Sequence, residues 1–134
     1  MPSRPPEFFG APDPALARLP FSEAVHAGEF LILSGQIGNT PGTVAPVPGG
    51  IAAEARQAME NVRRVLERHG ASLSDVVKFT VFLANMAEWD TFNEVYRTFF
   101  SGRFPARSAL GANGLAKGAR VEVECVAYLP RRSP

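Results

Sequence analysis

Two strand-like segments near the end of the chain carry charge among small and apolar residues. In FPARSALG, Arg107 alternates with Ala109 and Gly111, and side chains at alternate strand positions share one face of a sheet. Such small neighbours leave room for something to approach the guanidinium. In VEVECVA, Glu122 and Glu124 share a face. A glutamate in an apolar, partly dry pocket has a raised pKa and can exchange a proton near neutral pH.

Both segments also have structural interpretations, and these stay open at this point. Arg107 can pair with Glu122 or Glu124 of a neighbouring strand, and the two glutamates can lie on a solvated edge strand. Since two carboxylates at alternate positions repel when both are buried and ionised, at least one should reach solvent or a cation. Taken alone, the residues predict only a small-anion pocket built on strand ends.

Other motifs narrow the chemistry. Ser34-Gly35-Gln36 ends a strand with a residue that lacks Cβ, so a ligand can come close to the backbone N–H, although an isolated SGQ is more often a turn. No pair of side chains has metal-ligand spacing, and the chain has no Ser-His-Asp set, glycine-rich dinucleotide motif or P-loop. We therefore expect no metal and no nucleotide cofactor.

Composition limits the class of protein. The chain has 134 residues, a formal charge of +1 and one cysteine, Cys125. This length is typical of one domain, the charge offers no field to recruit nucleic acid, and a single cysteine excludes an intrachain disulfide. Residues 1–14 lack the apolar stretch that is typical of a signal peptide, and no apolar run has the length expected for spanning a bilayer. We expect a cytoplasmic protein without membrane partners.

The elements that must position these residues follow from periodicity. Residues 1–20 are proline-rich and predict an extended arm, followed by a single domain over 20–130. Helical spacing covers 51–69, with Gly70 as its stop. A second helix begins after Asn85. Residues 21–38 predict two strands around a turn at Ala27-Gly28, the second of them at 30–34, and further strands are predicted at residues 76–83, 106–111 and 120–129.

The order ββ-α-β-α-ββ predicts an α+β domain with two helices packed on one face of a mixed sheet. Two helices cannot easily cover both faces. The uncovered face is expected to carry the apolar side of the last strand, and this predicts self-association. The residues concerned are Val121, Val123, Cys125 and Ala127.

The motifs together resemble the Rid/YjgF family, the enamine/imine deaminases. The resemblance runs from about Pro20 to Tyr128, and its residues are PFSEAV, LSGQIG, DVVKFTVFL, FNEVY, FPARSALG and VEVECVA. It implies a chorismate-mutase-like α+β fold and homotrimers in which the sheets line a central barrel. Active sites are then expected between subunits. The implied reaction is hydrolysis of reactive 2-imino or enamine acids, of the 2-aminoacrylate/2-iminopropanoate type, to 2-keto acids and ammonia, without a cofactor.

The resemblance also assigns roles to residues. Arg107 is expected to bind the substrate carboxylate, since a guanidinium donates two parallel hydrogen bonds, and Glu122 to activate the attacking water. Glu124 is expected to be structural. The positions that line the pocket in the family are Ser34, Gly35, Asn93, Phe21 and Ala109.

Two of these positions depart from the best-known deaminases. Phe21 replaces a tyrosine and Ala109 replaces a residue that is often cysteine, so the pocket is less polar and the preferred substrate can be larger or more apolar. The alternative hypothesis is a non-catalytic trimer that binds small carboxylate metabolites or a protein partner. Family members are also described as ribonucleases, but the near-neutral charge here argues against nucleic acid.

Overall fold

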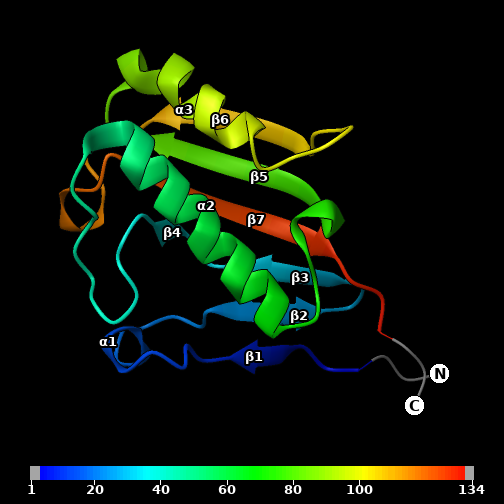
Figure 1. The fold of residues 1–134 in the computed structure, drawn as a ribbon. Coiled ribbons are helices and arrows are strands. Elements are labelled where there is room, and N and C mark those ends of the chain that lie inside the picture. The colour runs from blue at the N-terminus through cyan, green and yellow to red at the C-terminus, as the bar shows by residue number, and fades with distance from the viewer. Residues whose placement is uncertain (1–3, 132–134) are drawn as a thin grey trace.

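The computed structural model describes residues 4–131 and shows one mixed sheet with its two long helices on the same face (Figure 1). The helices are α1 (Pro14–Ala17), α2 (Gly50–Arg68) and α3 (Trp89–Arg97), with single 3₁₀ turns at Leu73–Asp75, Met86–Glu88 and Ala116–Gly118. The strands are β1 (Glu7–Phe9), β2 (Ala24–Ala27), β3 (Phe30–Leu33), β4 (Gln36–Ile37), β5 (Val76–Leu83), β6 (Ala106–Gly111) and β7 (Val121–Tyr128). The predicted α+β class is confirmed.

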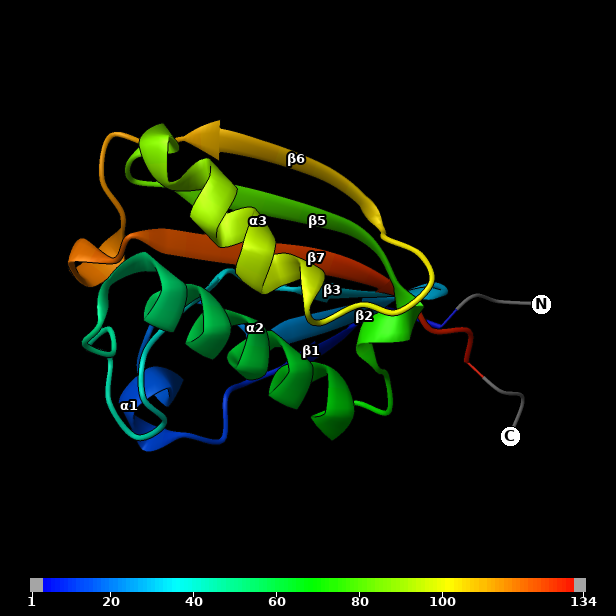
Figure 2. The same cartoon turned by 45° about the horizontal axis from the view of Figure 1, so that its top comes forward.

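The sheet has the order β1-β2-β3-β7-β5-β6, and β4 continues along β7 beyond the end of β3. All pairings are antiparallel except β5 with β6. The two strands that carry Arg107 and Glu122 are therefore not neighbours, because β5 lies between them. Figure 2 shows α3 lying over the β5–β6 side of the sheet and α2 crossing its centre.

The residues of β7 that face the helices are not those that the sequence analysis predicted. Val121, Val123, Cys125 and Ala127 are at most 3% exposed and form the core with α2 and α3, so they are not the uncovered side of β7. That assignment was wrong because alternation shows which residues share a face and not which face meets the helices. The open face instead carries the alternate positions of β7, which include Glu122 and Glu124.

The boundaries predicted for β5 and α2 agree with the structure to within one residue. β5 spans Val76–Leu83 and α2 ends at Arg68, just before Gly70. Gly70 has a φ of +83°, a left-handed conformation that glycine adopts at little cost, which explains why the helix stops there. Asn85 accepts a hydrogen bond from the Ala87 N–H at 2.9 Å and so caps the 3₁₀ turn that leads into α3.

The proline-rich start of the chain contributes to the sheet. Residues 1–3 of the predicted arm lie outside the described residues, and the rest includes β1, which pairs with β2, and the single turn α1. α1 begins at Pro14 after the cap Asp13, whose carboxylate accepts from the Ala15 N–H. The division of the chain at residue 20 stays a prediction.

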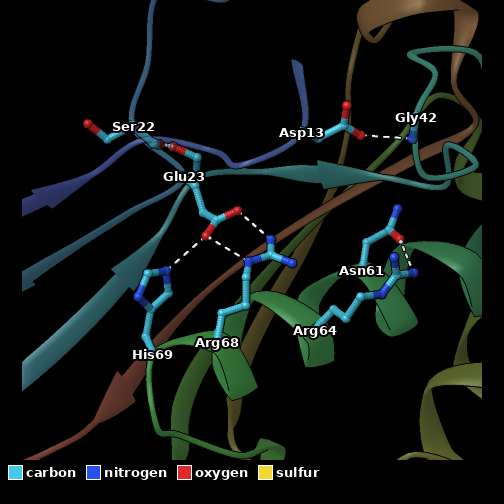
Figure 3. Close-up of polar contacts among 9 residues, drawn as sticks. Asp13, Ser22, Glu23, Gly42, Asn61, Arg64, Arg68 and His69 are labelled. Carbon is cyan, nitrogen blue, oxygen red and sulfur yellow. Dashed lines mark hydrogen bonds and ion pairs between the residues drawn. The ribbon is translucent and has the colours of Figure 1, made fainter. Parts of the chain in front are cut away.

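A buried carboxylate joins this segment to the end of α2. Glu23 is 4% exposed, and its carboxylate accepts hydrogen bonds from Nε and Nη2 of Arg68 and lies 2.8 Å from Nε2 of His69 (Figure 3). The ring of His69 also packs against Phe9 of β1, with centroids 4.5 Å apart. The Glu23 backbone accepts from the Ser34 N–H at 3.0 Å, so this cluster also holds the end of β3.

We expect the Glu23→Gln variant to lose about 1–3 kcal/mol of unfolding free energy, because an amide cannot accept from all three partners of the carboxylate. Urea unfolding followed by circular dichroism measures the change. The matched control is Glu60→Gln. Glu60 forms an ion pair with Arg63, and each of these two side chains is 41% exposed. That exposed pair should change stability by less than about 0.5 kcal/mol. Equal losses in the two variants would contradict a stabilising role for the buried cluster.

Candidate functional site

Arg107 lines a cavity of about 240 Å³ between α3 and the start of β6. The residues around it are Trp89, Asn93, Tyr96, Arg97, Phe104, Pro105 and Arg107. Arg107 reaches it because it pairs in register with the buried Phe79, so its side chain is on the helix-covered face. A larger cavity, of about 570 Å³, shares Phe104 and Pro105 but does not include Arg107.

The guanidinium of Arg107 is surrounded by aromatic rings. Its Cζ lies 4.8 Å from the ring centroid of Tyr96, 5.8 Å from that of Phe92 and 6.0 Å from that of Trp89. These cation–π contacts restrict the side chain without using its N–H donors. Among residues 4–131 the guanidinium of Arg107 makes no ion pair and no hydrogen bond. Its donors are therefore available to an anion.

Two further polar groups of the cavity have unused hydrogen-bonding capacity. Oδ1 of Asn93 and the hydroxyl of Tyr96 are enclosed and have no partner in the described part of the chain. Both belong to α3 and, being three positions apart, lie on the same side of that helix. Burial raises the pKa of Tyr96 to about 12, against an opposing effect of Arg107, so the phenol stays protonated and able to donate.

The other expected site residues form a second group, at the junction of β3, β4 and β7. Glu122 pairs in register with Ile37, and a Cβ on Gly35 would overlap Oε2 of Glu122 and lie 2.9 Å from its Cδ. The carboxylate therefore rests directly on the Gly35 backbone. The Ser34 hydroxyl donates to the Ser22 carbonyl at 2.6 Å, which places Ser34 next to the segment of Phe21, itself 50% exposed.

The surroundings of Glu122 make its carboxylate a better proton acceptor than an ordinary glutamate. Partial burial raises the pKa of its carboxyl above the ordinary value, and repulsion by Glu124 raises it further. The raised pKa makes the carboxylate more basic than one in water.

The two groups lie on opposite faces of the sheet within one chain. Arg107 shares the helix-covered face with Phe79, whereas Glu122 alternates with the buried Val121 and Val123 and so is on the open face. The structural interpretation in which Arg107 pairs with Glu122 or Glu124 is thus excluded inside one chain. Ala109 shares the face of Arg107 but packs on the core and does not line the 240 Å³ cavity.

Between residues 4 and 131 no three His, Cys, Asp or Glu side chains gather where they would hold a metal ion. No helix in that range has the length and the apolar character needed to cross a bilayer.

Sequence analysis missed part of the Arg107 cavity. Tyr96 belongs to the quoted FNEVY motif, three residues after Asn93, so helical spacing would have indicated it. Trp89, four residues before Asn93, follows from the same spacing. Arg97, four residues after Asn93, follows from the same spacing. Phe104 has no such signal, because it is the segment after α3 that brings its ring against Tyr96.

Comparison with known proteins agrees with the family resemblance that the sequence motifs indicate. The family model described as endoribonuclease L-PSP matches residues 12–129. The mouse and human 2-iminobutanoate/2-iminopropanoate deaminases are each 43% identical over 108 residues. That match covers 81% of this chain, 80% of the mouse protein and 79% of the human protein.

Solved structures share the fold over nearly their whole length. RidA from the Antarctic bacterium Psychrobacter sp. PAMC 21119 superimposes with a TM-score of 0.84 at 35% identity, covering 92% of this chain and 99% of RidA. Yeast Mmf1 superimposes with a TM-score of 0.86 at 34% identity, covering 93% of this chain and 99% of Mmf1.

Proposed function

Since this chain belongs to the Rid/YjgF family, whose model carries the description endoribonuclease L-PSP, we propose that it hydrolyses 2-imino acids to 2-keto acids and ammonia. Support comes from relatives that are 43% identical and are named 2-iminobutanoate/2-iminopropanoate deaminases. The observation that carries the proposal is Arg107, an unpaired guanidinium in an aromatic cavity without a carboxylate in its lining.

In the proposed reaction, Arg107 binds the substrate carboxylate through two parallel N–H donors. Glu122 accepts a proton from water as the water oxygen bonds to the imine carbon, and the electron pair of the C=N double bond moves to the protonated nitrogen. The proton held by Glu122 then passes to the amine nitrogen of the carbinolamine, and ammonia leaves as the C–N bond breaks. The hydroxyl proton passes to the freed ammonia, which departs as ammonium, so the ketone forms and Glu122 is again a carboxylate. The reaction consumes one water and needs no redox partner.

This mechanism needs a second copy of the chain, because one chain holds Arg107 and Glu122 on opposite faces of its sheet. We propose a homotrimer in which Glu122 of one copy faces Arg107 of the next. The open face suits such contact, since it exposes apolar side chains of β3, β6 and β7, each about two-fifths exposed or more. These are Phe30, Ile32, Leu110 and Tyr128.

Phe21, Ser34 and Gly35 belong to the Glu122 half of the proposed site, and Asn93 belongs to the Arg107 half. Ala109 is not proposed to contact the substrate, because it packs on the core and does not line the Arg107 cavity. The cytoplasmic location expected from the sequence stays a prediction.

A coupled assay tests the proposal. An amino-acid oxidase generates imines from a panel of amino acids, and semicarbazide traps the imine that remains. Faster loss of trapped imine with the protein present, together with 2-keto acid and ammonia, supports deamination. If every imine persists while 2-keto acids still bind, the protein is a non-catalytic carboxylate binder. If the protein instead cleaved RNA and neither hydrolysed imines nor bound 2-keto acids, both the deaminase and the carboxylate-binder interpretations would be rejected.

The glutamate pair predicts a pH dependence. Removing the charge of Glu124 removes one cause of the raised pKa of Glu122, so Glu122 should stay ionised to lower pH. We therefore expect the acid limb of kcat/KM in Glu124→Gln to move to lower pH than in the wild type. A pH profile of imine hydrolysis measures this. An acid limb that stays in place would show that another group controls it.

Gly35 predicts a loss of activity without a loss of stability. The Cβ of Gly35→Ala would occupy the position of the Glu122 carboxylate, which is the flexible end of a long side chain and can move away. We expect kcat/KM to fall roughly a hundredfold, the scale of a catalytic group misplaced by about 1 Å, while the melting temperature changes little. Gly10→Ala is the control, since its Cβ would meet no atom within 4 Å. Unchanged activity in Gly35→Ala would contradict the placement of Glu122.

A further inference from the structure

A third cavity, of about 130 Å³, lies between the N-terminal segment, the loop after β4 and α2. We propose that it binds a small zwitterionic α-amino acid, of about the size of alanine. This inference goes beyond the proposed function and does not depend on it, because neither Arg107 nor Glu122 lines this cavity. Most of the lining is polar or charged, unlike the aromatic lining around Arg107.

The cavity is separate from the proposed active site. Gln36 of its lining pairs in register with the buried Val123, so its side chain is on the helix-covered face, opposite to Glu122. β1 of the N-terminal segment and β6, which carries Arg107, are the two edges of the sheet. Figure 2 shows α1 and the loop before α2 on the side of α2 that is away from α3.

The wall on α2 is fixed by hydrogen bonds that need no ligand. Asn61 is 8% exposed, and its Nδ2 donates to the backbone carbonyls of Ile37 and Asn39, each at 3.0 Å. Its Oδ1 accepts from Nε2 of Gln57 at 2.9 Å. These bonds join α2 to the segment after β4, so the cavity exists in the free protein and a ligand does not have to order it.

Asp13 forms the opposite wall, on the N-terminal segment. Its Oδ2 accepts from the Gly42 N–H at 2.8 Å, and its Oδ1 accepts from the Ala15 N–H at 2.9 Å (Figure 3). A carboxylate has about four lone-pair sites, so Asp13 can accept further hydrogen bonds. Within residues 4–131 it forms no ion pair, and its negative charge is not balanced.

Arg64 supplies an unbalanced positive charge to the same cavity. Its Nη2 donates to Oδ1 of Asn61 at 3.3 Å, and the guanidinium has no other hydrogen bond and no ion pair in the described chain. The side-chain amide of Gln36 likewise has no hydrogen bond there. The other two charges of the lining, Glu23 and Arg68, are already bonded to each other.

This arrangement matches a zwitterion better than a simple ion. The ligand carboxylate accepts from Arg64 and Gln36, and its ammonium donates to Asp13. A simple anion would be repelled by Asp13, and a simple cation by Arg64. The volume corresponds to roughly four water molecules at ~30 Å³ each, which limits the ligand to the smallest amino acids.

Nuclear magnetic resonance titration with L-alanine tests the site. The Gly42 amide reports on it, because that N–H donates to Asp13. We expect a saturable shift of the Gly42 resonance with a Kd on the order of 1 mM, since the ligand has few atoms and Arg64 is exposed to competing water. Acetate, methylammonium and inorganic phosphate should bind at least about tenfold more weakly, because each forgoes one set of charge-assisted hydrogen bonds.

Calorimetry on variants identifies the groups that bind. Arg64→Gln and Asp13→Asn should each weaken L-alanine binding at least about tenfold. Arg56→Gln is the matched control, since Arg56 is an exposed arginine of the same helix that does not line the cavity, and its affinity should equal that of the wild type. Arg107→Ala should also retain binding, which distinguishes this cavity from the proposed active site.

Three results would overturn the inference. The first is the absence of a saturable shift with L-alanine. The second is phosphate binding as tight as that of L-alanine and unaffected by Asp13→Asn, which would assign the cavity to anions. The third is loss of L-alanine binding in Arg107→Ala, which would place the ligand in the other cavity. None of these results decides whether imines are hydrolysed, so the coupled assay tests the proposed function separately.

Discussion

Replacing Arg107 by alanine should lower kcat/KM for imine hydrolysis by about 10- to 150-fold, which corresponds to roughly 1.5–3 kcal/mol for hydrogen bonds to a charged group. The guanidinium has no ion pair or hydrogen bond within the described chain, and its only contacts of note are with the rings of Tyr96, Phe92 and Trp89. The loss should therefore come from the substrate carboxylate and not from a broken internal pair. Steady-state kinetics on the imine panel measures it.

Two controls separate this role from packing. Arg107→Lys keeps the positive charge but loses the planar pair of donors, so it should recover only part of the activity. Arg56→Ala removes an arginine from the exposed surface of α2, away from the cavity, and should leave kcat/KM unchanged. If Arg107→Ala kept the wild-type kcat/KM, the carboxylate-binding role would be rejected.

Replacing Glu122 by glutamine should cost more, about 10²- to 10⁴-fold in kcat, because the amide cannot accept the proton of the attacking water. Glutamine has nearly the same shape, so the contact with Gly35 is kept and KM should change little. Glu124→Gln is the matched control on the same strand face and should change the pH profile with a much smaller loss of rate. Comparable losses in the two variants would shift the general-base role away from Glu122.

Mixing the two inactive variants tests where the site is assembled. When Arg107→Ala and Glu122→Gln chains are unfolded together and refolded, some interfaces unite the intact Arg107 of one copy with the intact Glu122 of another. Random assembly restores about a quarter of the sites if each site uses two copies. Activity of the mixture well above that of either variant alone supports the shared site. No recovery in confirmed mixed oligomers would mean that the two residues do not act across an interface.

The sequence by itself determined the two long helices, the longer strands and the pairs of residues that share a face, but not the short elements β1, α1 and β4. The β-branched run of β5 was located to the residue, and the periodicity of α2 with its Gly70 stop was located to within one residue at each end. Arg107 with Ala109, and Glu122 with Glu124, were correctly assigned to common faces. These features depend on local backbone geometry, since strand side chains alternate and a left-handed residue ends a helix wherever the rest of the chain lies.

Only the tertiary structure decided which face each residue meets. The parallel pairing of β6 with β5 and the antiparallel pairing of β7 with β5 set Arg107 against α3 and Glu122 on the open face. The same pairing buried the apolar side of β7 that sequence analysis had left uncovered. Phe104 joined Trp89 and Tyr96 only through the turn after α3. Strand register and helix placement come from contacts between distant segments, and a one-residue slip in pairing would reverse every face, so local alternation cannot supply them.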